Sequence, residues 1–285
     1  MHPATRLREA LARPGLIQVP GCYDALSARL IEEAGYPAAY LSGFGVAASL
    51  GLPDTGLMGF REMLDRAAAV ADAVALPVLA DADTGYGNAV NVYRTVRAYA
   101  KAGLAAVQIE DQVWPKRCGH TQGKAVVPLE EAVGKIRAAV DAREEQDIVV
   151  VARTDARAVL GFQAALDRCL AFQEAGADVI FLEAPESEEE MAAAARRLRA
   201  PLLANMVEGG KTPVLDRDSL ERLGYKIAIY PLSLLMAAVT AVQEHLGRRG
   251  KRGQFLPREE GASFEALKQL AGFPDYYRRE ARYRS

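Results

Sequence analysis

The fold is decided by Ile148-Val149-Val150-Val151-Ala152-Arg153, where an uninterrupted apolar run leads directly into an arginine. A run this apolar is typical of a strand that is buried on both faces, as in a parallel sheet. Similar short runs recur along the chain and alternate with longer segments whose apolar residues have helical spacing. The predicted strands cover residues 16–19, 38–41, 77–80, 106–109, 148–152, 179–182, 201–204 and 227–229.

Helices are predicted between these strands. A glycine suited to a left-handed cap ends several of the segments just before the next strand, at Gly35, Gly103, Gly176 and Gly224. Strict alternation of strand and helix implies parallel strands, and eight such units favour a (β/α)8 TIM barrel over an open doubly wound sheet. The predicted helices include residues 24–33, 61–74, 90–101, 129–142, 164–174 and 188–198.

Polar side chains stand where most of the predicted strands end. The carboxyl ends of the strands converge on one face of a barrel, and that face carries the active site. Polar residues commonly begin where strands end, but three acids, an arginine and an asparagine exceed what this tendency explains. The residues are Ser42, Asp81, Glu110, Arg153, Glu183, Asn205 and Tyr230.

Composition excludes several classes of protein. The 285 residues carry 35 basic and 37 acidic side chains, so no overall field attracts nucleic acid or an anionic membrane. No apolar run reaches the roughly 18 residues of a membrane span, and the first residues lack the apolar core of a signal peptide. Three cysteines and three histidines are too few for a disulfide framework or a multi-histidine metal site. We therefore expect a soluble cytoplasmic protein.

The segment Asp81-Ala82-Asp83-Thr84-Gly85-Tyr86-Gly87 places two carboxylates at and just beyond a predicted strand end. Clustered carboxylates suit Mg²⁺, or Mn²⁺, which also takes water and substrate oxygens as ligands. Asp54 and Glu110 could complete such a site. An isolated pair of this kind often only caps a helix or shapes a turn. The further acids expected on the same face favour the metal.

The segment Lys116-Arg117-Cys118-Gly119-His120 surrounds one cysteine with cationic side chains. Positive charge near a thiol favours the thiolate, which suits Cys118 to proton transfer or nucleophilic attack. The alternative is a basic surface loop with an incidental cysteine.

Two further features point to an anionic ligand. Arg153 ends a buried strand and needs an anionic partner, either a substrate carboxylate or a neighbouring acid such as Glu183. Gly43 and Gly45 let backbone N–H groups approach an anion closely, although spaced glycines also simply make turns.

Together these motifs resemble the isocitrate lyase and phosphoenolpyruvate mutase superfamily, in particular its 2-methylisocitrate lyase-like branch, from about residue 20 to residue 233. The resemblance implies that Asp81 and Asp83 hold Mg²⁺ largely through water, with Asp54 and Glu110 in support. It also implies that Cys118 is a general acid on a mobile loop, with Lys116 and His120 beside it. The residues implied around the substrate are Ser42, Gly43, Phe44, Gly119, Arg153, Glu183 and Asn205.

The implied reaction is a retro-aldol cleavage of a 2-hydroxy dicarboxylate to an α-keto acid and a carboxylate. Met236 stands where methylisocitrate lyases carry an arginine, and Thr121-Gln122-Gly123-Lys124 replaces their Arg-Pro-Asn-Lys. The pattern is closer to dimethylmalate lyase and the plant petal death protein, which puts a tricarboxylate substrate in doubt. Other possibilities are an oxaloacetate decarboxylase or hydrolase, a carboxyphosphonoenolpyruvate phosphonomutase, and a non-catalytic α-keto acid binding protein.

The C-terminal region is expected to be separate from the barrel. A barrel of residues 1–247 is predicted to precede a glycine-rich basic hinge and a helical arm, residues 248–285, with a helix at 263–271 and a charged tail from 275. The resemblance implies a homotetramer, a dimer of dimers, in which a helix after the barrel is exchanged between subunits. A solvated appendage is the other interpretation.

Overall fold

The computed structural model describes residues 1–119, 121, 123–248, 254–255, 257 and 261–284. Contacts within the chain divide it into two compact units, Met1–Ser233 and Leu234–Ser285.

The first unit contains eight strands that all run parallel, in the order β6-β5-β4-β3-β2-β1-β8-β7. A parallel bridge between Ile180 and Leu202 brings β6 beside the segment that enters β7, so the sheet forms a nearly closed barrel. This confirms the predicted (β/α)8 TIM barrel. The strands are β1 (Ile17–Cys22), β2 (Ala39–Leu41), β3 (Val78–Asp81), β4 (Ala106–Glu110), β5 (Val149–Thr154), β6 (Val179–Leu182), β7 (Leu203–Asn205) and β8 (Ile227–Tyr230).

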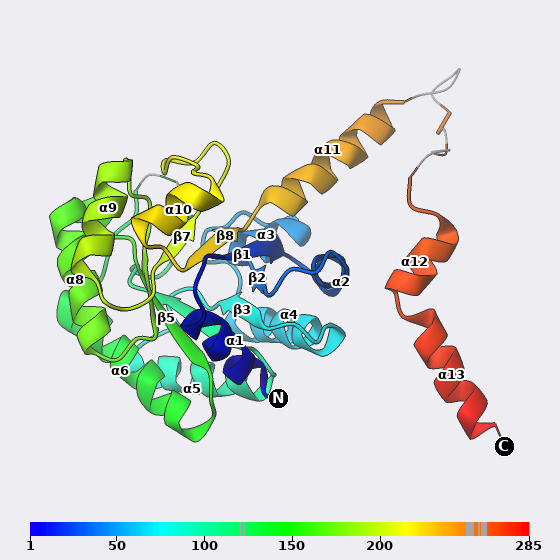
Figure 1. Ribbon diagram of the computed structural model, residues 1–285, viewed down its shortest axis with the longest axis horizontal. Coiled ribbons are helices and arrows are strands. Elements are labelled where there is room, and N and C mark those ends of the chain that lie inside the picture. The colour runs from blue at the N-terminus through cyan, green and yellow to red at the C-terminus, as the bar shows by residue number, and fades with distance from the viewer. Residues whose placement is uncertain (120, 122, 249–253, 256, 258–260, 285) are drawn as a thin grey trace. The chain divides into compact units, whose positions relative to one another are not determined.

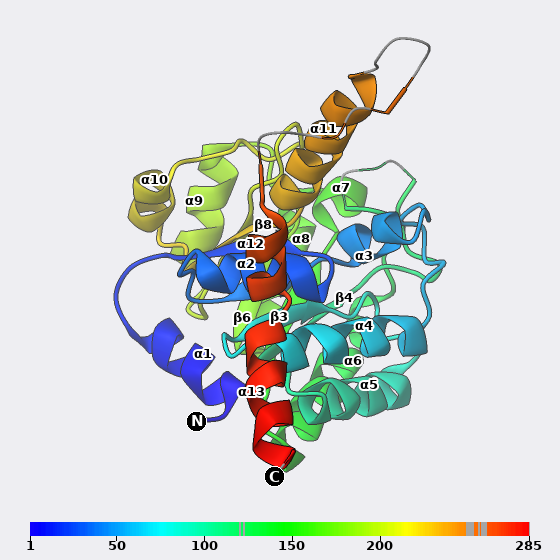
Figure 2. The same ribbon diagram turned by 90° about the vertical axis from the view of Figure 1, so that its right-hand side faces the viewer.

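Helices surround the strands of this unit (Figure 1), and α5 and α6 lie side by side in both ribbon views (Figure 2). Local side-chain caps start several of them, as where Asp24 accepts a hydrogen bond from the Ser27 backbone at 2.7 Å. The helices are α1 (Pro3–Ala12), α2 (Ala25–Glu33), α3 (Gly43–Ser49), α4 (Phe60–Ala73), α5 (Ala89–Lys101), α6 (Leu129–Glu145), α7 (Arg157–Leu160), α8 (Phe162–Glu174), α9 (Glu188–Arg197) and α10 (Arg217–Leu223).

Helix α1 was not predicted from the sequence, and it helps to define which end of the barrel is open to substrate. Its Leu7 side chain is buried in the same core cluster as Ile17, Ala106 and Val149, which begin their strands. The amino-terminal strand ends are therefore covered by apolar packing, and the carboxyl ends remain for chemistry.

The second unit contains most of α11 (Ser233–Gly247) together with α12 (Phe264–Leu270) and α13 (Phe273–Tyr283). The segment predicted only as a charged tail is helical in α13. Pro274 stands in its first turn, and Glu280 pairs with Arg284 one turn later at 2.5 Å, both of which favour a helix. No helix among the described residues is long and apolar enough to cross a membrane.

Candidate active site

The carboxyl ends of the strands bring the predicted site residues to one end of the barrel. Asp81, Glu110 and Asn205 are the last residues of β3, β4 and β7, and Arg153 is the last but one of β5. A cavity of about 50 Å³ at this end is lined by Tyr40, Ser42, Phe44, Asp54, Asp81, Lys116, Cys118, Gly119, Arg153, Glu183, Asn205, Val207, Ile229, Pro231 and Leu232. A larger open pocket of about 770 Å³ shares Phe44, Asp54, Lys116 and Cys118 with it.

Arg153 is buried among three carboxylates. Its Nε lies 2.9 Å from Asp155 Oδ2 and 3.3 Å from Glu110 Oε2, and its Nη2 lies 3.1 Å from Glu183 Oε2. Burial alone lowers the pKa of Arg153, but these carboxylates raise it well above its usual value. The Asn205 amide donates to Glu183 Oε2 at 3.2 Å and fixes that acid. The arginine is therefore a permanent cation in a rigid setting, as recognition of a carboxylate requires.

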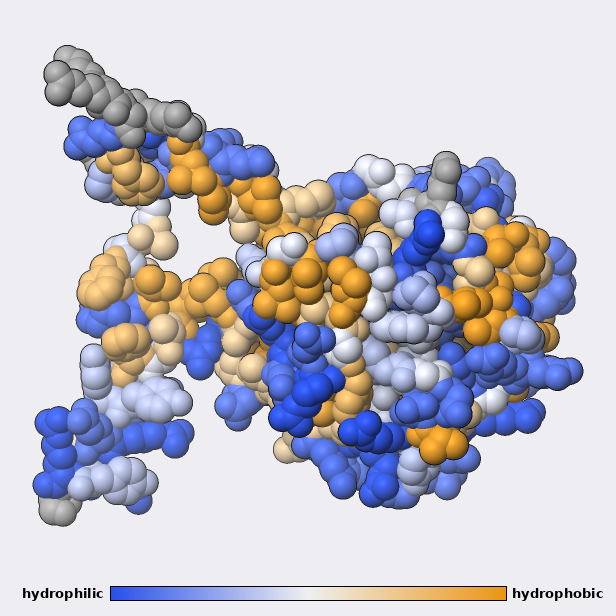
Figure 3. Space-filling model, turned by 180° about the vertical axis from the view of Figure 1, so that it is seen from behind, coloured by the Kyte–Doolittle hydropathy of each residue, from blue (hydrophilic) through white to orange (hydrophobic). Residues whose placement is uncertain are grey.

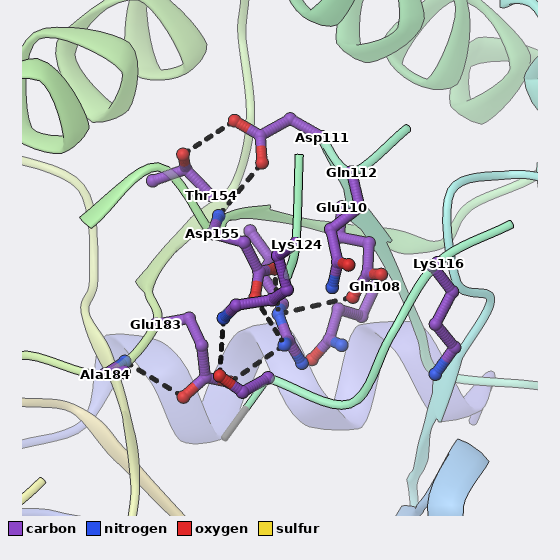
Figure 4. Close-up of polar contacts among 12 residues, drawn as sticks. Gln108, Glu110, Asp111, Gln112, Lys116, Lys124, Thr154, Asp155, Glu183 and Ala184 are labelled. Atoms are coloured by element: carbon purple, nitrogen blue, oxygen red, sulfur yellow. Dashed lines mark hydrogen bonds and ion pairs between the residues drawn. The ribbon is translucent and has the colours of Figure 1, made fainter. Parts of the chain in front are cut away.

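Asp155 was not predicted as a site residue, yet it organises this cluster (Figure 4). It is paired with Arg153 on one side and with Lys124 Nζ, at 2.8 Å, on the other. Burial raises the pKa of Asp155, but the two cations prevail and hold it at about 2. Its backbone N–H donates to Asp111 Oδ1 at 2.9 Å. Arg168 Nη1 donates to the other oxygen of Asp111, Oδ2, at 3.0 Å. A buried polar network thus fixes the Asp155 carboxylate.

Asp81 and Asp83 form the second charged group. The Asp83 backbone N–H donates to Asp81 Oδ1 at 3.0 Å, and the Gln108 amide donates to the same oxygen at 3.2 Å. Asp83 has a left-handed φ of 48°, a conformation that costs energy and occurs often at functional sites. Burial raises the pKa of Asp83 to about 6, although the Lys116 ammonium lowers it. Lys116 Nζ lies 2.9 Å from Asp83 Oδ1 and also contacts Asp54.

This donor set fits a cation that uses few protein ligands. Among the described residues, no group of three or more acidic, histidine or cysteine side chains is arranged to hold a metal. Mg²⁺ usually takes one or two carboxylates and completes its shell with water and substrate oxygens. Asp81 and Asp83 suit that role. Of the other predicted ligands, Asp54 is paired with Lys116 and Glu110 with Arg153, while Glu110 Oε1 is buried and accepts no hydrogen bond from the described residues.

Gly43 and Ser42 shape the wall beside the two aspartates. A Cβ on Gly43 would lie 2.8 Å from Asp81 Oδ2, so glycine is needed for this close approach. The Ser42 hydroxyl accepts from the Gly45 N–H at 3.1 Å and caps α3, while Phe44 lines the cavity. The glycine that was predicted to allow a close backbone approach to an anion therefore lies against the Asp81 carboxylate.

Cys118 lies on a loop, residues 112–126, that is paired at its base by an antiparallel bridge between Gln112 and Val126. The Gln112 side chain accepts from the Arg117 N–H at 2.9 Å and donates to its carbonyl at 2.8 Å. The Cys118 N–H donates to the Asp54 carbonyl at 3.2 Å. These bonds hold the thiol segment at the cavity. His120, also predicted here, lies outside the described residues.

Gly119 passes so close to the charged cluster that a side chain has no room. A Cβ there would overlap the Arg153 guanidinium and lie 3.0 Å from the Glu183 carboxylate. We expect Gly119→Ala to displace the loop and to reduce turnover roughly 100-fold, because small misplacements of reacting groups have effects of that size. Steady-state kinetics with thermal unfolding would measure this. Gly134→Ala is the control, since nothing lies within 4 Å of its Cβ; equal turnover by the two variants would contradict the expectation.

Two residues inside predicted strands also belong to the site. The Tyr40 hydroxyl donates to Gln108 Oε1 at 3.1 Å, and the Gln108 amide in turn holds Asp81. Burial raises the pKa of Tyr40 well above its usual value, so it remains protonated as a donor. The sequence signal that could have identified these two residues is the presence of a hydroxyl, on Tyr40, and an amide, on Gln108, within otherwise apolar strands.

Comparisons with known proteins agree with this geometry. The chain matches the family described as phosphoenolpyruvate phosphomutase over residues 7–248. It is 51% identical to 2,3-dimethylmalate lyase of Eubacterium barkeri over 243 residues, which cover 85% of this chain and 84% of the relative. It is 44% identical to 2-methylisocitrate lyase of Aeropyrum pernix over 283 residues, covering 98% and 91%.

Solved structures extend the likeness. Oxaloacetate acetylhydrolase bound to 3,3-difluorooxalacetate matches with a TM-score of 0.93 at 38% identity, covering 98% of this chain and 96% of that one. Phosphonopyruvate hydrolase in complex with oxalate and Mg²⁺ matches with a TM-score of 0.86 at 34% identity, covering 100% of both chains. Family match, identity and fold agree over nearly the whole chain. The chain therefore belongs to the phosphoenolpyruvate mutase/isocitrate lyase superfamily.

Proposed function

We propose that this chain is a Mg²⁺-dependent lyase that cleaves a 2-hydroxy dicarboxylate of the 2-alkylmalate type to an α-keto acid and a carboxylate. The observation that carries the proposal is the cavity where Asp81, the buried Arg153 and the Cys118 thiol meet, with Asp83 hydrogen-bonded to Asp81. The identity of 51% to a 2,3-dimethylmalate lyase supports this substrate class.

The proposed reaction breaks the bond between C2 and C3 of the malate. The hydroxyl on C2 loses its proton to a base and becomes the keto group, while the bonding electron pair stays on C3 as an enediolate of the departing carboxylate. Cys118 donates the proton that C3 then receives. Arg153 and the backbone N–H groups of residues 43–44 hold the carboxylate next to the keto group. Asp81 and Asp83 would hold Mg²⁺, which would supply Lewis acid stabilisation of the oxygen charge that develops beside the broken bond.

The cavity wall favours an alkyl substituent over a third carboxylate. Val207, Ile229, Pro231 and Leu232 give it an apolar side, and the resemblance implies that the chain has Met236 in place of an arginine of methylisocitrate lyases. We expect 2-methylisocitrate to be a poorer substrate than a 2-alkylmalate, because a missing charge-assisted contact costs roughly 1.5 to 3 kcal/mol. Specificity constants for both substrates would measure this. A higher constant for methylisocitrate than for every alkylmalate would contradict it.

A second candidate function is hydrolysis of oxaloacetate. The likeness to oxaloacetate acetylhydrolase, at 38% identity, favours it specifically. The same metal and arginine would bind the keto acid, but breakdown of oxaloacetate depends less on a thiol donor. Incubation with 2-alkylmalates, 2-methylisocitrate and oxaloacetate in the presence of Mg²⁺ tests both functions. Formation of keto acid from malates supports the lyase, and acid production from oxaloacetate alone supports the hydrolase.

We also propose that the chain forms a homotetramer in which a helix after the barrel is exchanged between subunits. None of the residues of α11, α12 or α13 is buried, and hydrophobic residues lie along the surface of α11 (Figure 3). Exposed apolar surface of this extent marks an interaction site. Light scattering after gel filtration would measure the mass, and a monomer at micromolar concentration would overturn the proposal. The exposed side chains include Met236, Val239, Val242, Leu246, Phe264, Leu267, Phe273 and Tyr277.

A further inference from the structure

Lys124, in the 112–126 loop, has a buried environment, and the proposed reaction gives this lysine no role. It lies on the returning arm of the loop, and only 2% of its side chain is exposed. Its ammonium donates to the carbonyl of Gly119, next to the thiol residue, and to Asp155 Oδ1 at 2.8 Å. A lysine is rarely buried in this way unless each contact is satisfied. Lys124 therefore ties the thiol arm of the loop to the barrel.

The partner of Lys124 in the barrel is also the partner of Arg153. Asp155 is fully buried, and its Oδ2 accepts from Arg153 Nε at 2.9 Å while its Oδ1 contacts Lys124. Arg153 faces Glu110 and Glu183 as well. Two cations share one carboxylate, so withdrawal of Lys124 leaves Asp155 paired with Arg153 alone. The guanidinium would then be attracted more strongly to Asp155 and would be less available to a substrate carboxylate.

The loop also forms part of the cavity wall. Lys116, Cys118 and Gly119 form part of the wall of the cavity at the carboxyl ends of the strands, and Lys116 and Cys118 also line the larger open pocket beside it. A displacement that carries Gly119 and Lys124 away from the barrel would break the contact between Lys124 and Asp155.

We propose that Lys124 is a positioning residue that couples the position of the thiol segment, residues 116–119, to the orientation of Arg153, through the Asp155 carboxylate that both cations share. The coupling to catalysis rests on the proposed function. The latch, defined as the contact of Lys124 with the Gly119 carbonyl and Asp155, does not rest on it, because its effect on the thiol segment can be measured in protein without substrate.

The test compares Lys124→Met, Lys124→Arg and the control Lys101→Met, which removes an exposed lysine from α5. The first measurement is the rate of Cys118 alkylation by iodoacetamide in ligand-free protein, with the modified peptide identified by mass spectrometry. We expect the rate to rise at least tenfold in Lys124→Met and to stay near the wild-type rate in Lys101→Met. Lys124→Arg, which keeps the charge, should restore most of the protection.

The second measurement separates coupling from a purely structural latch. In Lys124→Met, we expect kcat for 2-alkylmalate cleavage to fall roughly 100-fold and KM to rise, because the thiol is misplaced and Arg153 is less available to the substrate carboxylate. A circular dichroism spectrum and a thermal midpoint like those of the wild type establish that the variant is folded. An alkylation rate within twofold of the wild-type rate overturns the latch whether or not malate is cleaved. An unchanged kcat in an enzyme that cleaves malate overturns the coupling.

Discussion

Removal of divalent cations with a chelator is expected to abolish carbon–carbon cleavage, and Asp81→Asn or Asp83→Asn should do the same. Asp81 Oδ1 accepts hydrogen bonds from Asp83 and Gln108, which an asparagine oxygen still accepts, so the substitution removes charge with little change in local structure. We expect a loss of at least roughly 1,000-fold, since both electrophilic stabilisation of oxygen charge and substrate orientation are lost. Rates of keto acid release before and after addition of Mg²⁺ would measure it.

The control for this prediction is Asp65→Asn, which changes an exposed acid on α4 that pairs with Arg61 in the preceding turn. Its activity should match the wild type. Binding of Mn²⁺, followed by electron paramagnetic resonance, gives a reading that does not depend on turnover and should weaken only in the Asp81 and Asp83 variants. Full activity in a metal-free preparation would end the claim.

Cys118→Ser should reduce cleavage at least roughly 100-fold, the usual cost of losing one general acid. Serine keeps the size and the hydrogen bonding of cysteine, but its hydroxyl is a much weaker acid than a thiol. Pyruvate and Mg²⁺ should still bind, because neither Arg153, which is proposed to bind the carboxylate, nor Asp81 and Asp83, which are proposed to bind the metal, depends on the sulfur. Single-turnover rates and product affinity, measured on the same preparation, separate loss of chemistry from loss of binding.

The other cysteines offer an internal comparison. Burial raises the pKa of Cys22 to about 12 and also raises that of Cys169, and both side chains are fully buried. Cys118 is partly exposed, so a small electrophile should modify it first. Bound pyruvate should slow that modification. A serine variant that cleaves within a few-fold of the wild-type rate would remove Cys118 from the mechanism and favour the oxaloacetate hydrolase.

The barrel was predictable because its signals are local. A buried strand such as β5 is apolar over its whole length, and the glycines that end helices, such as Gly224 with a φ of 93°, mark the return to the next strand. The polar ends of β3, β4 and β7 could also be assigned to one face, since parallel barrel strands place their carboxyl ends together. Helix α1 packs in a core cluster that includes residues distant in sequence, such as Val149 and Val179, so its place in the core was not visible.

The unpredicted part of the site depends on pairs that are distant in sequence. Asp155 follows Arg153 by two residues and looks like an ordinary loop acid; only its contact with Lys124, 31 residues earlier, shows its importance. The sequence equally showed Lys116 near Cys118, but not that its ammonium lies between Asp54 and Asp83. Local sequence patterns therefore identified the site residues at strand ends. The pairing of residues that lie far apart in sequence could be seen only in the structure.

The most direct test of the central claim is cleavage of 2,3-dimethylmalate in deuterium oxide, followed by nuclear magnetic resonance. The proposed reaction gives pyruvate and propionate in equal amounts, because the bond between C2 and C3 breaks once for each molecule. The propionate should carry a single deuterium on the former C3, delivered to one face by the exchanged donor at position 118. Absence of keto acid release from 2,3-dimethylmalate and from every 2-alkylmalate tested, with rapid conversion of oxaloacetate to oxalate and acetate under the same conditions, would contradict the assignment as a malate lyase.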